Sequence, residues 1–201
     1  MQMLAGNGER TLRQVADELL EHRRVEFIHE GKLTLVAVPG YSHAEIVRQV
    51  GRQFSRQTSV EWYVRSGDFQ FDRIDFPERF FVPDIAVAHP PVRSNAECRK
   101  NLVMVMEVTS PKSPETVEND FGIKRKHYAK GKVPLYLLVD QEHGVWQLHG
   151  LTSDWPIYKI FLEGAYGEPV RLPEPFRFTL PTDRWPAYDP TREPEGQNPP
   201  P

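Results

Sequence analysis

Seven consecutive residues, LVMVMEV at 102–108, constrain the fold more than any other stretch of the chain. Six of them are apolar, which is typical of a strand buried on both faces near the centre of a sheet. The exception is Glu107. Because a dry, unpaired carboxylate costs several kcal/mol, two interpretations follow. Either the strand ends at Glu107 in solvent, or water, a lysine or a metal serves this carboxylate.

Helical and strand periodicities along the rest of the chain predict a mixed α/β domain, with neither repeated βαβ units nor an all-β pattern. Helices are expected at 11–24, at 42–57 with Ser42 and Glu45 as a capping box, and from about 115 to 130, ended by Gly131. Strands are expected within 25–38 (a hairpin), 60–72, 79–90, 102–108, 134–140, 144–151, 155–164 and 176–181.

Asp84 follows Pro83 within one of these predicted strands, RFFVPDIAVAHP at 79–90. Proline lacks the N–H group that a central strand needs, so an edge strand or a bulge is expected at this point. The aspartate is either an ordinary turn or strand-end residue, or part of a site shared with other charged groups.

Lys124 lies in the middle of an apolar helical stripe. At about 100° per residue, Val117, Phe121 and Tyr128 fall within the same narrow arc of the third predicted helix. A lysine that faces inward needs an anionic partner. The alternative is an ordinary surface pair with Asp120, four residues earlier, which leaves the shared buried arc unexplained.

Asp84, Glu107 and Lys124 are together the candidates for one site. Two carboxylates in oxygen-rich surroundings suit a hard divalent cation such as Mg²⁺. Such a cation would polarise a phosphodiester and lower the pKa of a water molecule. The lysine would orient that water or stabilise negative charge in the transition state.

These segments, in this order, resemble the PD-(D/E)XK restriction-endonuclease-like superfamily, and more narrowly a large bacterial family of restriction endonucleases on that fold. The resemblance spans roughly residues 11 to 166. It implies a restriction-endonuclease-like mixed β-sheet core flanked by helices, with an added N-terminal helix and hairpin. It also implies endonucleolytic hydrolysis of DNA with Mg²⁺ or Mn²⁺. Its carriers are VEFIHEGKL, His43, VPDIAV, VMEVTSP and the D-x3-K-x3-Y-x2-G-x-P-x-Y run from Asp120 to Tyr136.

The resemblance also implies roles for particular residues. Asp84 and Glu107 would bind the metal, with the backbone carbonyl of Val108 as a third ligand. A standard motif has lysine two residues after the glutamate, where this chain has Thr109, so Lys124 would substitute for it. Four accessory candidates, each either structural or part of the site, are Glu26, His43, Asp120 and Tyr128.

Composition adds an alternative function. The formal net charge of −3 gives no overall attraction to nucleic acid. Together with Thr109, it favours a catalytically inactive nuclease-fold module that binds or acts as a scaffold.

The single cysteine, Cys98, fits a reducing compartment. No apolar run approaches the roughly 20 residues of a membrane span, so a cytoplasmic protein without membrane contact is expected.

The expected domain limits are a flexible N-terminus at 1–10, the restriction-endonuclease-like domain at 11–185 and a disordered, Pro-rich tail at 186–201. The tail has almost no side chains that a core would bury. A homodimer is expected by analogy with other endonucleases of this fold.

Overall fold

The computed structural model describes residues 25–28, 32–35, 39–57, 60–67, 71–73, 76–111, 119–154 and 156–192. The predicted helix at 11–24 and the N-terminus at 1–10 lie outside them. In this part of the chain, no helix combines the length and the apolar character needed to cross a membrane.

The chain divides into two compact units. One contains two hairpins, and the other contains all the remaining helices and strands described below. The first hairpin is the one predicted at 25–38. The strands of the smaller unit are β1 (Val25–Ile28), β2 (Lys32–Leu35), β4 (Phe71–Arg73) and β5 (Phe76–Phe81).

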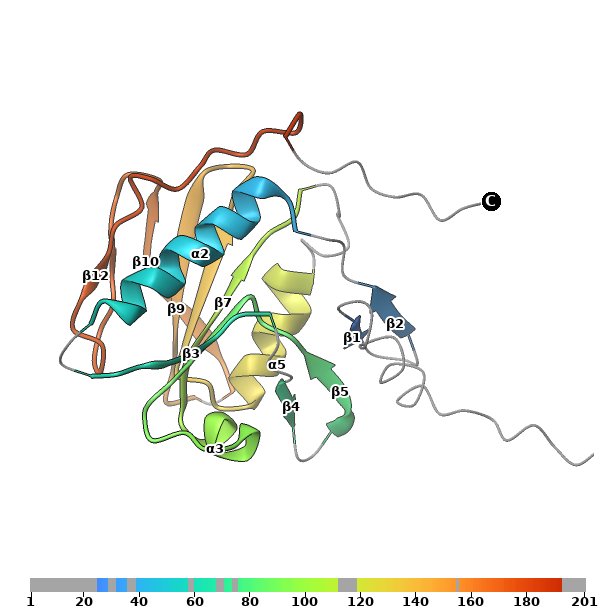
Figure 1. The fold of residues 1–201 in the computed structure, drawn as a ribbon. Coiled ribbons are helices and arrows are strands. Elements are labelled where there is room, and N and C mark those ends of the chain that lie inside the picture. Colours follow the sequence, from blue (N-terminus) through green and yellow to red (C-terminus); the bar gives the residue numbers. More distant parts are fainter. Residues whose placement is uncertain are drawn as a thin grey trace, which may run out of the picture. The chain divides into compact units, whose positions relative to one another are not determined.

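A six-stranded mixed sheet forms the larger unit, with the strand order β10-β9-β8-β7-β6-β3 (Figure 1). Only β7 and β8 pair in parallel among these neighbours. The apolar run at 102–108 is β7, which lies inside the sheet as predicted, and all its residues are buried. The strands are β3 (Tyr63–Arg65), β6 (Ile85–Ala88), β7 (Leu102–Val108), β8 (Leu135–Asp140), β9 (Val145–Leu151) and β10 (Tyr158–Ala165).

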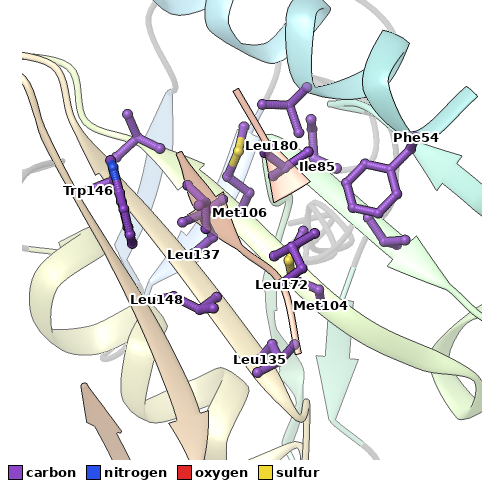
Figure 2. Close-up of a cluster of buried hydrophobic side chains, with 14 of the residues drawn as sticks. Phe54, Ile85, Met104, Met106, Leu135, Leu137, Trp146, Leu148, Leu172 and Leu180 are labelled. Atoms are coloured by element: carbon purple, nitrogen blue, oxygen red, sulfur yellow. The ribbon is translucent and has the colours of Figure 1, made fainter. Parts of the chain in front are cut away.

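One face of the sheet carries the hydrophobic core. Helix α2 (Tyr41–Ser55) covers it together with the segment around β11 (Val170–Arg171) and β12 (Thr179–Leu180). Phe54 of α2 lies edge-on to Phe176, with ring centroids 5.4 Å apart. Figure 2 shows the apolar side chains that meet here, among them Phe54, Ile85, Met104, Met106, Leu135, Leu137, Trp146, Leu148, Leu172 and Leu180.

The opposite face of the sheet carries polar groups. Side chains alternate along β7 and β8, so Glu107 and Tyr136 point away from the core of Figure 2. A helical segment covers them. It consists of a π-helical stretch, η1 (Asn119–Lys124), that continues into α5 (Arg125–Lys130). Tyr128 packs on Tyr136 with ring centroids 5.7 Å apart, which seats α5 on this face.

Helix α2 lacks the predicted capping box. Gly40 is its N-cap, and no side chain caps the helix. Ser42 lies inside the first turn, where its hydroxyl donates to the carbonyl of Ala187 at 3.2 Å. Glu45 accepts a hydrogen bond from Arg48 Nε at 2.6 Å. The first turn is therefore tied to the C-terminal segment through Ser42.

Pro83 separates two strands and does not interrupt one. β5 ends at Phe81 and β6 begins at Ile85. Because β6 lies between β3 and β7, the strand that follows the proline is not an edge strand, and its register shift lies at Val87–Ala88 and not at Pro83. The proline is tolerated because it precedes the strand, where no ladder hydrogen bond requires its missing N–H.

The third predicted helix ends at Lys130 as expected, but without the usual left-handed glycine. Gly131 has φ −78°, and the left-handed conformation falls on Lys132 at φ 61°. The beginning of this prediction, including Val117, lies outside the described residues. A short helix that was not predicted, α3 (Asn95–Lys100), begins where the Ser94 hydroxyl accepts the N–H of Glu97.

The predicted domain limits remain predictions. The described residues continue past 186, and two contacts tie them to the first turn of α2. One is the hydrogen bond from Ser42 to Ala187, and the other is the guanidinium of Arg192, 4.9 Å from the centre of the Tyr41 ring.

His149 makes the stability of the protein sensitive to acid. Its ring is 1% exposed, and neither nitrogen has a hydrogen-bond partner among the described residues. Burial, with a smaller contribution from Arg125, lowers its pKa from 6.5 to about 4. Between these two pKa values, His149 is protonated in the unfolded chain and neutral in the folded chain. The stability contributed by neutral His149 is lost as the pH falls from about 6.5 to about 4.

We expect the wild-type chain to lose about 2 kcal/mol more than His149→Phe between pH 7 and pH 5, measured by urea unfolding at each pH. Phenylalanine preserves a ring beside Tyr136, whose centroid lies 5.7 Å from that of His149, and removes the titrating group. Equal losses in the two proteins would exclude His149 as the source of the acid sensitivity.

Candidate active site

Glu107 is buried, with 1% of its surface exposed. The hydroxyl of Tyr128 donates to Oε1 at 2.7 Å, and Lys124 Nζ lies 3.2 Å from Oε2. The strand therefore does not end in solvent at this residue. Inside the protein, the carboxylate is hydrogen-bonded by Tyr128 and paired with Lys124.

Lys124 faces inward, as the helical arc predicts, with 3% of its surface exposed. Its ammonium also lies 3.0 Å from Asp120 Oδ1. The pair with Asp120 thus exists, but it is buried and not on the surface. The two lysines that follow on α5, Lys126 and Lys130, are exposed.

Asp84 lies on the same face of the sheet as Glu107. Ile85 pairs with Met106, so continuing the antiparallel register by one residue places Asp84 opposite Glu107. Directly opposed residues point to the same face, with Cβ atoms roughly 4.5 to 5.5 Å apart. Asp84 is 4% exposed, and its Oδ2 accepts the N–H of Val108 at 2.7 Å.

The carbonyl of Val108 points toward the same side as Asp84. In an antiparallel ladder, the N–H and C=O groups of one residue face the same neighbouring strand. The N–H of Val108 is directed at Asp84, so its carbonyl faces that side too. One further step of the register places Pro83 opposite Val108, and proline has no N–H to donate to this carbonyl.

His43 contacts Asp84 from the first turn of α2. Its Nε2 lies 3.1 Å from Asp84 Oδ1, and its ring is buried. The structure thus joins Asp84 to His43 and to the backbone of Val108. It joins Glu107, the residue before Val108 in β7, to Lys124.

Tyr136 supports the helical side of the site. Its hydroxyl donates to the backbone carbonyl of Asp120 at 2.8 Å. Burial first, and then the charges of Asp120 and Glu107, raise the pKa of this phenol well above its ordinary value. It therefore stays protonated and keeps its donor. In the sequence, Tyr136 stands out only as the end of a motif, and no local pattern indicates this contact with Asp120.

Thr109 occupies the position of the standard lysine and is buried. Its hydroxyl accepts the backbone N–H of Gln141 at 3.2 Å, and the Gln141 side-chain amide donates to its carbonyl. Thr109 therefore fastens the end of β7 to the residue after β8. No local pattern indicates Gln141, because the contact joins residues far apart in the chain. For Glu26, only the backbone in β1 is described.

The oxygen donors gathered here are of the chemical type that a hard divalent cation accepts. Within the described ranges, no group of three or more His, Cys, Asp or Glu side chains is arranged as a metal cluster. Mg²⁺, however, is commonly held by one or two carboxylates and keeps several waters. Asp84, Glu107 and the Val108 carbonyl are all hard oxygen donors. A carboxylate oxygen has two lone pairs, so it can accept a hydrogen bond and bind a cation at the same time.

Comparison with known proteins identifies the family. Residues 13–181 match the family described as "Uma2: Putative restriction endonuclease". The chain belongs to this family. No curated protein matches the chain.

A solved structure shares the fold of this Uma2 family member. It is described as a putative nuclease belonging to DUF820 from Anabaena variabilis ATCC 29413. The two chains are 20% identical, with a TM-score of 0.53 over 82% of this chain and 89% of the other. At that identity, the likeness shows the fold alone. The restriction-endonuclease-like fold and the family predicted from the sequence are thus confirmed.

Lys124→Met removes the ammonium that contacts Glu107 and Asp120. We expect the free energy of unfolding to fall by about 3 to 5 kcal/mol, because breaking a buried ion pair leaves uncompensated charge. The matched control is Lys126→Met, an exposed lysine two residues later, which should change stability by less than about 0.5 kcal/mol. Urea unfolding of both variants at pH 7 checks this. Equal stability of the two variants would contradict the buried pairing.

Proposed function

We propose that this protein is a Mg²⁺-dependent endonuclease that hydrolyses phosphodiester bonds of DNA. The observation that carries the proposal is the buried contact of Lys124 with Glu107, next to the Val108 N–H that holds Asp84. Membership of a family described as restriction endonucleases, and a fold shared with a nuclease, support this reaction over others.

Asp84 and Glu107, with the carbonyl of Val108, would hold Mg²⁺ or Mn²⁺. When bound, the cation would polarise the scissile phosphodiester and make a water molecule more acidic. The protein contributes fixed ligand positions. Asp84 Oδ2 is held by the Val108 N–H, and Glu107 Oε1 by the Tyr128 hydroxyl.

Lys124 would orient the attacking water or stabilise negative charge in the transition state. Its ammonium is held between Glu107 at 3.2 Å and Asp120 at 3.0 Å. These contacts fix the donor before the substrate arrives, so little reorganisation is needed during the reaction. Asp120 acts here through Lys124 and would be a positioning residue.

DNA as the substrate rests on the family. Exposed Lys126 and Lys130, close to Lys124 on the helical segment, would contact phosphates, and their contribution would weaken as salt increases. A homodimer and a cytoplasmic location stay predictions, and light scattering checks the first.

The alternative is a nuclease-fold module that binds without cleaving. Thr109 favours this alternative, because the side chain at the standard lysine position carries no amine and instead accepts the backbone N–H of Gln141 after β8. The two functions differ in whether the site binds a divalent cation and in whether DNA is cut.

Asp84→Asn, Glu107→Gln and Lys124→Met should each reduce DNA cleavage about 10²- to 10³-fold, the typical cost of removing a group that stabilises the transition state. The assay uses plasmid and single-stranded DNA with Mg²⁺ or Mn²⁺, and EDTA should abolish cleavage. Lys159→Met, an exposed lysine on the edge strand β10, is the control and should cleave like the wild type. Circular dichroism confirms that each variant is folded. Wild-type rates in folded Asp84→Asn and Lys124→Met would refute the assignments.

Mn²⁺ should stabilise the wild-type chain and not Glu107→Gln. Binding to the folded state at 100 times the dissociation constant adds about 2.7 kcal/mol, or roughly 5 to 10 °C in melting temperature. Differential scanning fluorimetry with a Mn²⁺ titration measures it. A wild-type melting temperature that does not change when Mn²⁺ is added would favour the binding or scaffold module.

A further inference from the structure

His43 lies against the carboxylate that is proposed to bind the cation. Its Nε2 is 3.1 Å from Asp84 Oδ1, while the Val108 N–H reaches Oδ2 at 2.7 Å. The two oxygens of one carboxylate therefore have donors from two different elements, helix α2 and strand β7. Together these contacts restrict rotation of the carboxylate plane.

The polar contact with Asp84 is the one that orients the imidazole. The nitrogen facing a carboxylate carries the proton, so Nε2 is the donor. The other nitrogen, Nδ1, is buried and has no hydrogen-bond partner among the described residues. Packing alone does not require the Nε2–H of His43 to point at the Asp84 carboxylate, so this contact indicates a polar role.

The first turn of α2 fixes the position of this ring. On its inner side, Ile46 belongs to the hydrophobic core. The buried Ser42 hydroxyl donates to the Ala187 carbonyl at 3.2 Å, and the Arg192 guanidinium lies 4.9 Å over the exposed Tyr41 ring. Figure 1 shows the C-terminal segment running past this end of α2. A side chain carried by an anchored helical turn can hold a neighbour in a defined orientation.

We infer that His43 is a positioning residue that fixes Asp84 for cation binding. The inference rests on the proposed function, because it assumes that Asp84 is a ligand. A carboxylate already oriented by its neighbours loses less rotational freedom when it binds the cation. Removing a hydrogen-bond partner of a metal ligand typically weakens metal affinity about 10- to 100-fold.

The test is the dissociation constant of Mn²⁺, measured by electron paramagnetic resonance of the free ion, for three variants. His43→Phe keeps the ring without the donor, and we expect affinity to fall about 10- to 100-fold. His43→Gln places an amide N–H close to the former Nε2 and should restore affinity to within about threefold of the wild type. His149→Phe makes the same substitution at a buried histidine that does not contact Asp84, and should leave the affinity unchanged.

Cleavage gives a second readout. Saturating Mn²⁺ should restore most of the rate of His43→Phe, because the ligands remain, whereas Asp84→Asn should stay inactive. If His43→Phe does not fold, His43→Asn, whose amide is too short to reach Asp84, takes its place. Wild-type Mn²⁺ affinity in the donor-free variant would overturn the role of His43 and leave the proposed function intact. If the wild-type chain itself binds no Mn²⁺, the metal site fails, and this inference fails with it.

Discussion

A charge buried in the middle of a sheet has to be compensated, and this requirement organises the whole polar face of the larger unit. Glu107 is met by Tyr128 and Lys124 from the helical segment. Lys124 is met in turn by Asp120, whose carbonyl accepts the hydroxyl of Tyr136 from the sheet. The contacts thus run from sheet to helix and back. Buried pairs of this kind are weak evidence for stability, but they specify how the helical segment sits on the sheet.

The two faces of the sheet divide the physical tasks. The face under α2 is packed with apolar side chains, including Met104 and Met106 from β7 (Figure 2). The opposite face carries Glu107 from the same strand, one residue after Met106. Alternation along one strand therefore places the carboxylate on the face of the sheet opposite the hydrophobic core. A rigid support of this kind is what a site needs to hold its groups in place.

Sequence patterns with a strong physical cause predicted the structure well. The apolar run at 102–108 had to be an interior strand, and the position of Lys124 on a helical arc correctly indicated its burial. Predictions were less accurate where a neighbouring residue could take the same structural role. Ser42 fits a capping box by spacing, yet Gly40 is the N-cap of the helix, and the Ser42 hydroxyl donates to the carbonyl of Ala187.

The contacts that complete the site were not predictable from spacing. His43 to Asp84, and Thr109 to Gln141, join segments whose approach depends on the assembled sheet. Pro83 illustrates a related limit, because the rule against proline in central strands holds, but the chain satisfies it by starting the strand after the proline.

In the proposed site, the acid and the amine belong to separately stabilised parts of the fold. In a standard motif, acid and amine sit two residues apart on one strand and stay together for as long as that strand is formed. Here Glu107 belongs to an interior strand, while Lys124 belongs to a helical segment laid over it. Segments that pack on a sheet from outside open at lower free energy than its central strands. Partial opening would therefore separate the amine from the acid while the sheet survives, so a half-folded chain would lack the proposed site.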